Sequence, residues 1–201
     1  QDAPNPHFVD MIKNKKIWCA SSTHKSEETF CAYTHLKLKE NYKDILTIII
    51  PRHISRIKSI SSELSKLNLK VVLYSNFDNS KNDFDILLID TYGETSKFFG
   101  ISKYVFLGGS LIKHGGQNPI EASRLGCKVF HGPNVYNFTE IYKFLNSLGI
   151  SKQVDSNEEL NQSLVEEFKQ NRPKNIQIIE KIDNYGLNVL NNVIKDIKKY
   201  I

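Results

Sequence analysis

The chain has 201 residues, of which 40% are hydrophobic and 24% are charged. These proportions are typical of a globular protein and exclude a disordered or collagen-like chain. Its 27 basic and 22 acidic residues give a net charge of +5, which is compatible with an anionic partner such as nucleic acid or a membrane surface. The longest aliphatic run, Ile45 to Ile50, is far shorter than the roughly 20 residues that span a bilayer. Because the chain begins with Gln1 rather than Met, we expect it to be a piece of a longer protein.

Short apolar runs alternate with amphipathic stretches along the chain. Continuous runs of Val, Ile and Leu are typical of strands covered on both faces, and apolar residues that recur at helical spacing predict the helices between them. Ser21, Ser22 and Thr23 are expected to cap the helix that Glu27 and Glu28 begin. The alternation predicts an α/β fold with a doubly wound, Rossmann-like parallel sheet of about six strands. We expect strands at 17–20, 45–50, 71–73, 86–89, 104–107 and 128–130, and later helices at 138–148, 157–168 and 176–201.

Three segments divide the chain. Residues 1–15 are polar and contain prolines, which suits a linker. Residues 16–175 form the α/β domain, and residues 176–201 form a final helix that Gly186 is expected to interrupt. The cysteines show neither a C-x-x-C pair nor a metal-ligand spacing, so we expect buried free thiols in a reducing compartment. They are Cys19, Cys31 and Cys127.

The loop from Gly108 to Pro119 holds four of the ten glycines. Ligands of a doubly wound sheet bind at the carboxyl ends of its strands, where this loop begins. Its Gly-Gly pairs let the backbone approach a ligand and turn N–H groups toward an anion, and the next helix adds its positive end. We expect a phosphate there, with Glu121 accepting hydrogen bonds from ribose hydroxyls. The alternative is a flexible loop that Asn118 caps. The spacing is neither G-x-G-x-x-G nor G-x-x-x-x-G-K-[ST], which argues against dinucleotide and P-loop sites.

Other loops also carry polar groups after predicted strands. Arg52 follows a buried strand and Pro51, where a guanidinium can bind a phosphate through two hydrogen bonds. Thr91 and the Gly93 amide can serve a ligand, whereas Glu94 can equally be a first-turn acid that complements the helix dipole. No nucleophile–base set or carboxylate pair emerges, so we interpret the chain as half of a site, the half that holds a phosphorylated donor. Three histidines, His24, His53 and His114, stand on separate loops. Their spacing is not that of metal ligands, so no metal site is predicted.

Five stretches stand in order along the chain: Ala20-Ser21-Ser22-Thr23-His24 with Glu27 and Glu28, Pro51-Arg52-His53 with Arg56, Asp90 to Glu94, Gly108 to Glu121, and Gly132-Pro133 with Asn137 and Phe138. They resemble the A-S-T-H-x-x-E-E, P-R-H-x-x-R, D-T-x-G-E, G-G-S-L-x-x-x-G-G-x-N-P-x-E and G-P-x-x-x-N-F motifs of the bacterial Kdo transferases, which attach 3-deoxy-D-manno-octulosonic acid (Kdo) to the lipid A precursor. The resemblance covers about residues 16–170 and is to the carboxyl-terminal half of the family. The departures are the extra serine, Lys25-Ser26 in place of Glu-Gly, Gln117 in place of His, and Ser123-Arg124 in place of a Pro-Ala pair.

The resemblance implies a GT-B glycosyltransferase, in which two Rossmann-like domains face each other across a cleft. This chain would be the carboxyl-terminal domain, which holds the donor substrate CMP-Kdo, with no cofactor and no metal. By match to the motifs, the implied donor-binding residues are Ser22, Arg52, Thr91, Gly93, Glu94, Gly109, Ser110, Gly115, Gly116, Asn118 and Glu121.

The amino-terminal domain of the family carries the catalytic glutamate, the acceptor-binding surface and the membrane anchor. The resemblance therefore implies no catalytic residue in this fragment, which is expected to be soluble and inactive alone, with its final helix packing back toward the missing domain. The parent enzyme would glycosylate the lipid A precursor in lipopolysaccharide biosynthesis, at the cytoplasmic face of the bacterial inner membrane. The net charge of +5 suits an anionic membrane surface and an anionic donor.

Two other functions stay open at this stage. Another GT-B enzyme, such as a UDP-sugar transferase or epimerase, would share the glycine-rich loop and the acidic start of the following helix. A nucleic-acid-binding module is suggested by the positive charge and by the basic tail from Lys195 to Lys199. No aromatic residues are interleaved on a basic face, so we expect no nucleic-acid partner.

Overall fold

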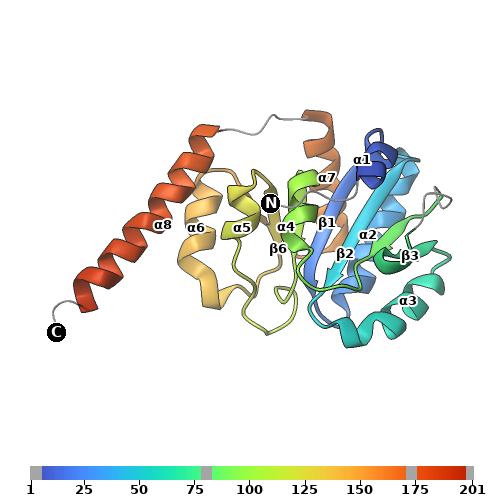
Figure 1. Ribbon diagram of the computed structural model, residues 1–201, viewed down its shortest axis with the longest axis horizontal. Coiled ribbons are helices and arrows are strands. Elements are labelled where there is room, and N and C mark those ends of the chain that lie inside the picture. The colour runs from blue at the N-terminus through green and yellow to red at the C-terminus, as the bar shows by residue number, and fades with distance from the viewer. Residues whose placement is uncertain (1–5, 78–82, 171–175, 198–201) are drawn as a thin grey trace.

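The computed structural model describes residues 6–77, 83–170 and 176–197 (Figure 1). Within them, seven strands form one parallel sheet in the order β3-β4-β2-β1-β5-β6-β7. The strands are β1 (Lys16–Thr23), β2 (Ile45–Pro51), β3 (Val71–Leu73), β4 (Ile86–Leu88), β5 (Tyr104–Leu107), β6 (Lys128–His131) and β7 (Ser151–Gln153). The α-helices are α1 (Pro6–Ile12), α2 (Glu27–Asn41), α3 (Ile57–Ser65), α4 (Thr95–Ile101), α5 (Ile120–Arg124), α6 (Thr139–Ser147), α7 (Asn157–Gln170) and α8 (Ile176–Ile197). Three short 3₁₀ turns, η1 (Ile54–Arg56), η2 (Tyr74–Asn76) and η3 (Tyr136–Phe138), join them.

The strand order reverses beside β1. On one side of β1 lie β2, then β4, and then β3 at the edge of the sheet, and the chain afterwards returns to place β5 on the other side of β1. The switch point of the sheet therefore lies between the carboxyl ends of β1 and β5, which is where doubly wound sheets bind ligands. The loops that leave these two strands are the first and fourth of the five motif stretches.

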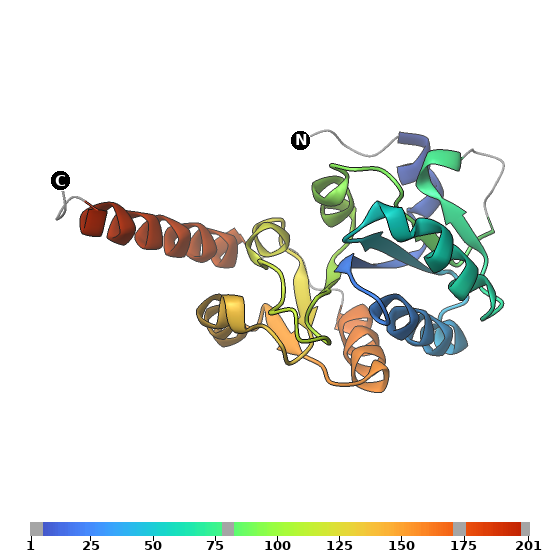
Figure 2. The same ribbon diagram turned by 90° about the horizontal axis from the view of Figure 1, so that it is seen from below.

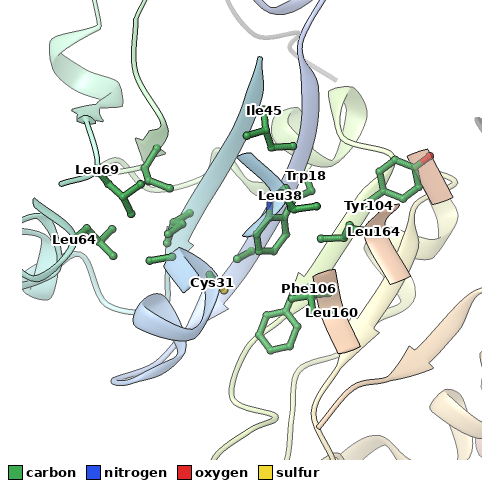
Figure 3. Packing of buried hydrophobic residues seen from close by; sticks show 14 of the residues in the cluster. Trp18, Cys31, Leu38, Ile45, Leu64, Leu69, Tyr104, Phe106, Leu160 and Leu164 are labelled. Atoms are coloured by element: carbon green, nitrogen blue, oxygen red, sulfur yellow. The ribbon is translucent and has the colours of Figure 1, made fainter. Parts of the chain in front are cut away.

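Helices cover both faces of the sheet. Trp18 belongs to a cluster that includes Leu38 of α2 and Leu64 of α3 (Figure 3). Its neighbour Cys19 belongs to the cluster on the opposite face, with α1, α4, α5 and α6, because side chains alternate along a strand. The fully buried side chains of β2 and β4 on both faces explain why these strands were predictable as continuous aliphatic runs.

All six predicted strands are confirmed, and the seventh, β7, was missed. Its three residues are Ser-Lys-Gln, of which only Ser151 is buried, so neither alternation nor an apolar run marked it. The expectation that Ser21 to Thr23 cap the next helix was wrong, because these residues continue β1. The N-cap position of α2 is Ser26, which makes no side-chain capping bond. Ser22 has a φ of 55° and lies at a register shift between β1 and β2, so the extra serine forms a β-bulge.

The two ends of the described chain also differ from expectation. In the segment expected to be a linker, Pro6–Ile12 forms α1, and the fully buried ring of Phe8 packs edge-on against Phe77 and Phe98. At the other end, α8 continues through Gly186 and projects from the body of the domain (Figure 2). The Arg124–Asp183 ion pair at 2.6 Å and the stacked rings of Phe144 and Tyr185 hold its first half. The expected basic tail runs partly outside the described residues, because 198–201 are not among them.

All three cysteines are free and buried, as expected. Burial raises the pKa of the Cys19 and Cys31 thiols well above the usual value, so both remain protonated at neutral pH and behave as small apolar side chains. Among the described residues, none of the helices combines the length and apolarity that crossing a membrane requires.

Candidate functional site

Three loops meet at the carboxyl edge of the sheet, around the switch point. The amide of Arg52, after β2, donates to the carbonyl of Thr23 at the end of β1 (3.0 Å), and the amide of Gly108, after β5, donates to the carbonyl of Ser21 (2.8 Å). The three strands are adjacent, so their ends and the loops that follow are tied to one another by backbone hydrogen bonds. The sequence prediction that these loops share one edge is confirmed.

The carboxylate of Glu27 is the centre of this junction. It is 0% exposed and accepts hydrogen bonds from four backbone amides: His24 (2.8 Å), Gly109 (2.7 Å), Ser110 (3.1 Å) and Leu111 (3.0 Å). A buried carboxylate is tolerated only when its oxygens are satisfied in this way. The glycine-rich loop therefore does form a nest of N–H groups around an anion, and that anion is a side chain of the protein itself.

The glycines of this loop allow the close packing. A Cβ atom on Gly108 would lie 2.6 Å from the carbonyl oxygen of Ser22 and 2.7 Å from Glu27 Oε2, so a side chain does not fit there. Gly115 and Gly116 have φ angles of +97° and +79°, a region that favours glycine. The amide of Gly116 donates to the carbonyl of Gly109 (2.9 Å), which closes the loop on itself.

An ion pair joins the first two motif stretches. The guanidinium of Arg56 donates to both carboxylate oxygens of Glu28, at 2.8 and 3.0 Å, and the Thr23 hydroxyl also donates to Glu28 (3.0 Å). Glu28 is buried, and a bidentate pair of this kind is both strong and geometrically specific. It fixes the start of α2 against the turn that follows β2.

Three imidazole rings from three loops lie next to one another at this edge. The ring centroids of His24 and His114 are 4.3 Å apart, and those of His24 and His53 are 6.0 Å apart. Burial and then the neighbouring His114 lower the pKa of His24, with smaller lowering effects of His53 and Arg56 and an opposing effect of Glu27. No group of three or more His, Cys, Asp or Glu side chains within 6–77, 83–170 and 176–197 is arranged to hold a metal ion.

The predicted donor-binding residues divide into two groups. Gly109, Ser110, Gly115 and Gly116 are buried, and the hydroxyl of Ser110 donates to the Leu107 carbonyl (2.5 Å) and accepts from the Gly132 amide (2.8 Å). These residues build the loop. By contrast, the residues that remain on the surface or at its margin are Ser22, Arg52, Thr91, Gly93, Glu94, Asn118 and Glu121.

Glu121 and Asn118 lie beside a hollow at the start of α5. The hollow has a volume of about 520 Å³ and is bounded by α5 on one side and by Asp183 of α8 on the other. Glu121 is exposed and accepts a hydrogen bond from the hydroxyl of Ser96, while the side-chain oxygen of Asn118 accepts the amide of Ile120 (3.0 Å). The N-cap position of α5 is Pro119, and Asn118, one residue earlier, satisfies the amide of the first helical residue with its side chain.

The loop after β4 joins this region through the same bond, because Ser96 lies in α4. The hydroxyl oxygen of Thr91 is buried without a hydrogen-bond partner. Gly93 has a φ of +80°, and a Cβ atom there would meet nothing within 4 Å. Glu94 lies 3.1 Å from Lys97. The loop thus combines a buried hydroxyl that has no partner with an exposed backbone, next to the start of α5.

Comparison with known proteins shows which proteins this chain is similar to. No family model matches the chain. The chain is 30% identical over 178 residues to the 3-deoxy-D-manno-octulosonic acid transferase of Haemophilus influenzae, an alignment that covers 89% of this chain and 41% of that protein. It is 34% identical over 149 residues to the enzyme of the same name from Rickettsia bellii, covering 74% of this chain and 35% of that protein. The chain is homologous to the Kdo transferases.

The match to the Kdo transferases covers only part of their length. It is accompanied by a similarity of fold. The chain spans less than half of the length of these two relatives. Its structure is similar to that of the carboxyl-terminal CMP-Kdo binding domain of WaaA from Acinetobacter baumannii, with a TM-score of 0.78 and 21% identity over 89% of this chain and 92% of that one. The predicted fold class, that of the carboxyl-terminal domain of a GT-B glycosyltransferase, is confirmed.

Three residues of the Kdo transferase motifs had no predicted function and turn out to organise the site: Glu27, Glu28 and Arg56. Two adjacent acids at a helix start are also what the helix dipole alone favours, so their partners could not be deduced from position. The available signal was that they recur in the motif pattern together with the glycines and with Arg52.

Proposed function

We propose that the chain is the CMP-Kdo binding domain of a Kdo transferase that glycosylates the lipid A precursor in lipopolysaccharide biosynthesis. The observation that carries this proposal is the gathering of Arg52 and three imidazoles at the switch point of a domain homologous to Kdo transferases. That edge presents the exposed guanidinium of Arg52, which forms no ion pair with another residue in the described part of the chain. It is suited to the phosphate of a nucleotide-linked sugar.

In this proposal, the residues of the chain hold the donor and stabilise its leaving group. Transfer of Kdo needs an acceptor hydroxyl that a base deprotonates, attack at the anomeric carbon, and release of CMP. As the bond to CMP breaks, negative charge grows on the phosphate, and Arg52 can stabilise it through charge-assisted hydrogen bonds. Glu121 accepts hydrogen bonds from the ribose hydroxyls, and Thr91 and Gly93 line the same region. Ser22, Glu94 and Asn118 belong to the proposed pocket by their places in the motifs.

The remaining functions of a transferase are assigned to the part of the protein outside this chain. The base, the acceptor-binding surface and the membrane contact belong there, so the isolated chain binds CMP-Kdo without turning it over. Helix α8, which projects from the domain (Figure 2), packs against that second domain. The parent enzyme acts at the cytoplasmic face of the bacterial inner membrane, where the net charge of +5 favours contact with an anionic surface.

Calorimetric titration of the chain with CMP, UMP and UDP tests the donor assignment. We expect CMP to bind most tightly and the Arg52→Ala variant to lose about 1–3 kcal/mol of binding free energy, which is typical of a charged hydrogen-bond donor. Lys152→Gln removes an exposed positive charge from the distant edge strand β7 and should leave the affinity unchanged. Tighter binding of UDP would instead identify a UDP-sugar enzyme, and no nucleotide binding at all would contradict the proposal.

A further inference from the structure

The three neighbouring imidazoles at the carboxyl edge carry an inference about protons. His24, His53 and His114 come from the loops after β1, β2 and β5, so their proximity is a product of the fold and not of sequence spacing. His53 and His114 are exposed, and His24 is half-buried. The Nε2 atom of His24 is buried without a hydrogen-bond partner. A ring nitrogen in that state is costly unless a ligand or a water molecule supplies a hydrogen-bond partner.

The charges around His24 are already engaged elsewhere. From α2, Glu27 faces it, but the carboxylate of Glu27 is held by four backbone amides. From the turn after β2, Arg56 faces it, but Arg56 is paired with Glu28. The other two groups that act on His24 are the imidazoles of His53 and His114. Without a bound anion, burial first and then His114 lower the pKa of His24, so the neutral ring is favoured despite the opposing effect of Glu27.

We propose that His24, His53 and His114 form a proton-coupled anion subsite, which takes up a proton when the phosphate of a nucleotide binds beside Arg52. A phosphate placed there supplies the negative charge that the cluster lacks, and this charge favours the protonated form of the His24 ring. The inference rests on the proposed function, because it takes a nucleotide phosphate as the ligand. It adds that protons bind together with that ligand.

The sign of the pH dependence follows from linkage. In the free chain the pKa of His24 is lowered, first by burial and then by His114, and the bound anion raises it again. The extra affinity is therefore fully present below the free-state pKa and is lost as pH rises through the bound-state pKa. A rise of about one pKa unit on binding corresponds to an affinity about tenfold higher at the acid end than at the alkaline end.

Calorimetric titration with CMP between about pH 6 and pH 8, in pairs of buffers with different heats of ionisation, measures the protons taken up on binding. The phosphate of CMP titrates in the same range, so wild type is compared with His24→Gln and with His114→Gln at each pH. Gln keeps polarity but does not titrate, and the backbone bond from residue 24 to Glu27 is available to any residue. Lys152→Gln is the control for loss of a positive charge outside the cluster.

We expect wild type and Lys152→Gln to take up more protons than either histidine variant, and to lose up to about tenfold more affinity over this pH range. Because His114 is exposed, His114→Gln remains informative if His24→Gln is unstable. Equal proton uptake and equal pH slopes in wild type and both variants would overturn the inference while leaving the proposed function intact. Absence of CMP binding to wild type at every pH would overturn the proposed function and, with it, this inference.

Discussion

The junction around Glu27 and the loop from Asp90 to Glu94 both follow strands at the same edge of the sheet. The two regions differ in how fully their polar atoms are hydrogen-bonded within the protein. At the junction, Glu27 is fully buried and four amides converge on it. In the other loop, Tyr92 is 81% exposed, the Thr91 hydroxyl has no partner and Gly93 borders open space. The comparison teaches that the motif residues at this edge are of two kinds: those that build the scaffold, and those that remain accessible on it.

The same division separates two arginines of one short segment. Arg56 is turned inward onto Glu28, whereas Arg52 is exposed and uses only its backbone amide to hold the edge together. Substitutions can therefore tell the two classes apart. Changes in the scaffold should lower stability, and changes in the presented groups should lower affinity alone.

The largest loss of stability is expected for Glu27→Ala. It leaves the four amides around the missing carboxylate without an acceptor in a buried site, and the free energy of unfolding should fall by about 3–5 kcal/mol. Urea denaturation measures the change. Glu121→Ala, at an exposed acid, is the matched control and should remain within about 0.5 kcal/mol of wild type. Equal stability of the two variants would show that the Glu27 junction is not a structural centre.

Next in size is the pair Gly108→Ala and Gly93→Ala. At Gly108 the new methyl group would lie 2.6 Å from a backbone oxygen, so we expect a loss of about 3 kcal/mol from overpacking. At Gly93 the space is open and only the φ of +80° is unfavourable, so the expected loss is about 1 kcal/mol. Thermal melting of both variants ranks them, and a reversed order would mean that the loop after β5 yields more easily than its packing implies.

A smaller loss is expected for Arg56→Ala. This substitution removes both donors from the buried carboxylate of Glu28 but leaves its bond from the Thr23 hydroxyl, so about 2 kcal/mol of stability should be lost. The neighbouring Lys58→Ala, at an exposed position of α3, should cost less than about 0.5 kcal/mol. Denaturant unfolding measures the stability of both variants. Equal midpoints for the two would refute a stabilising pair between Arg56 and Glu28.

The smallest effect on stability is expected for Arg52→Ala. Its side chain is exposed and its amide bond to Thr23 survives the substitution, so the unfolding free energy should change by less than about 0.5 kcal/mol. Its CMP affinity should nevertheless fall, as proposed above. A variant that unfolds early but binds CMP normally would place Arg52 in the scaffold and erase the division.

The division itself was only partly predictable from the sequence. Strands such as Ile45 to Ile50 can be recognised in the sequence, because burial on both faces requires a continuous apolar run. The short polar strand β7 and the helix α1, which buries Phe8, carry no such local signal, since tertiary contacts decide them. Likewise, the sequence predicts a bound phosphate at the amides of Gly109 and Ser110, but a local pattern cannot reveal that Glu27, 82 residues earlier in the chain, accepts their hydrogen bonds.

The bulge at Ser22 has a consequence for how this chain tolerates a change in length. Sheet pairing runs from Ser21 opposite Ile50 to Thr23 opposite Pro51, so the inserted residue is absorbed within a single step. Its left-handed backbone costs about 1–3 kcal/mol, but the insertion does not propagate along the chain. Thr23, His24 and Glu27 keep the relative spacing of the A-S-T-H-x-x-E-E pattern. The end of β1 can thus accommodate a change in chain length. An insertion or deletion there alters the backbone only at the bulge and leaves the positions of Glu27 and Glu28 unchanged.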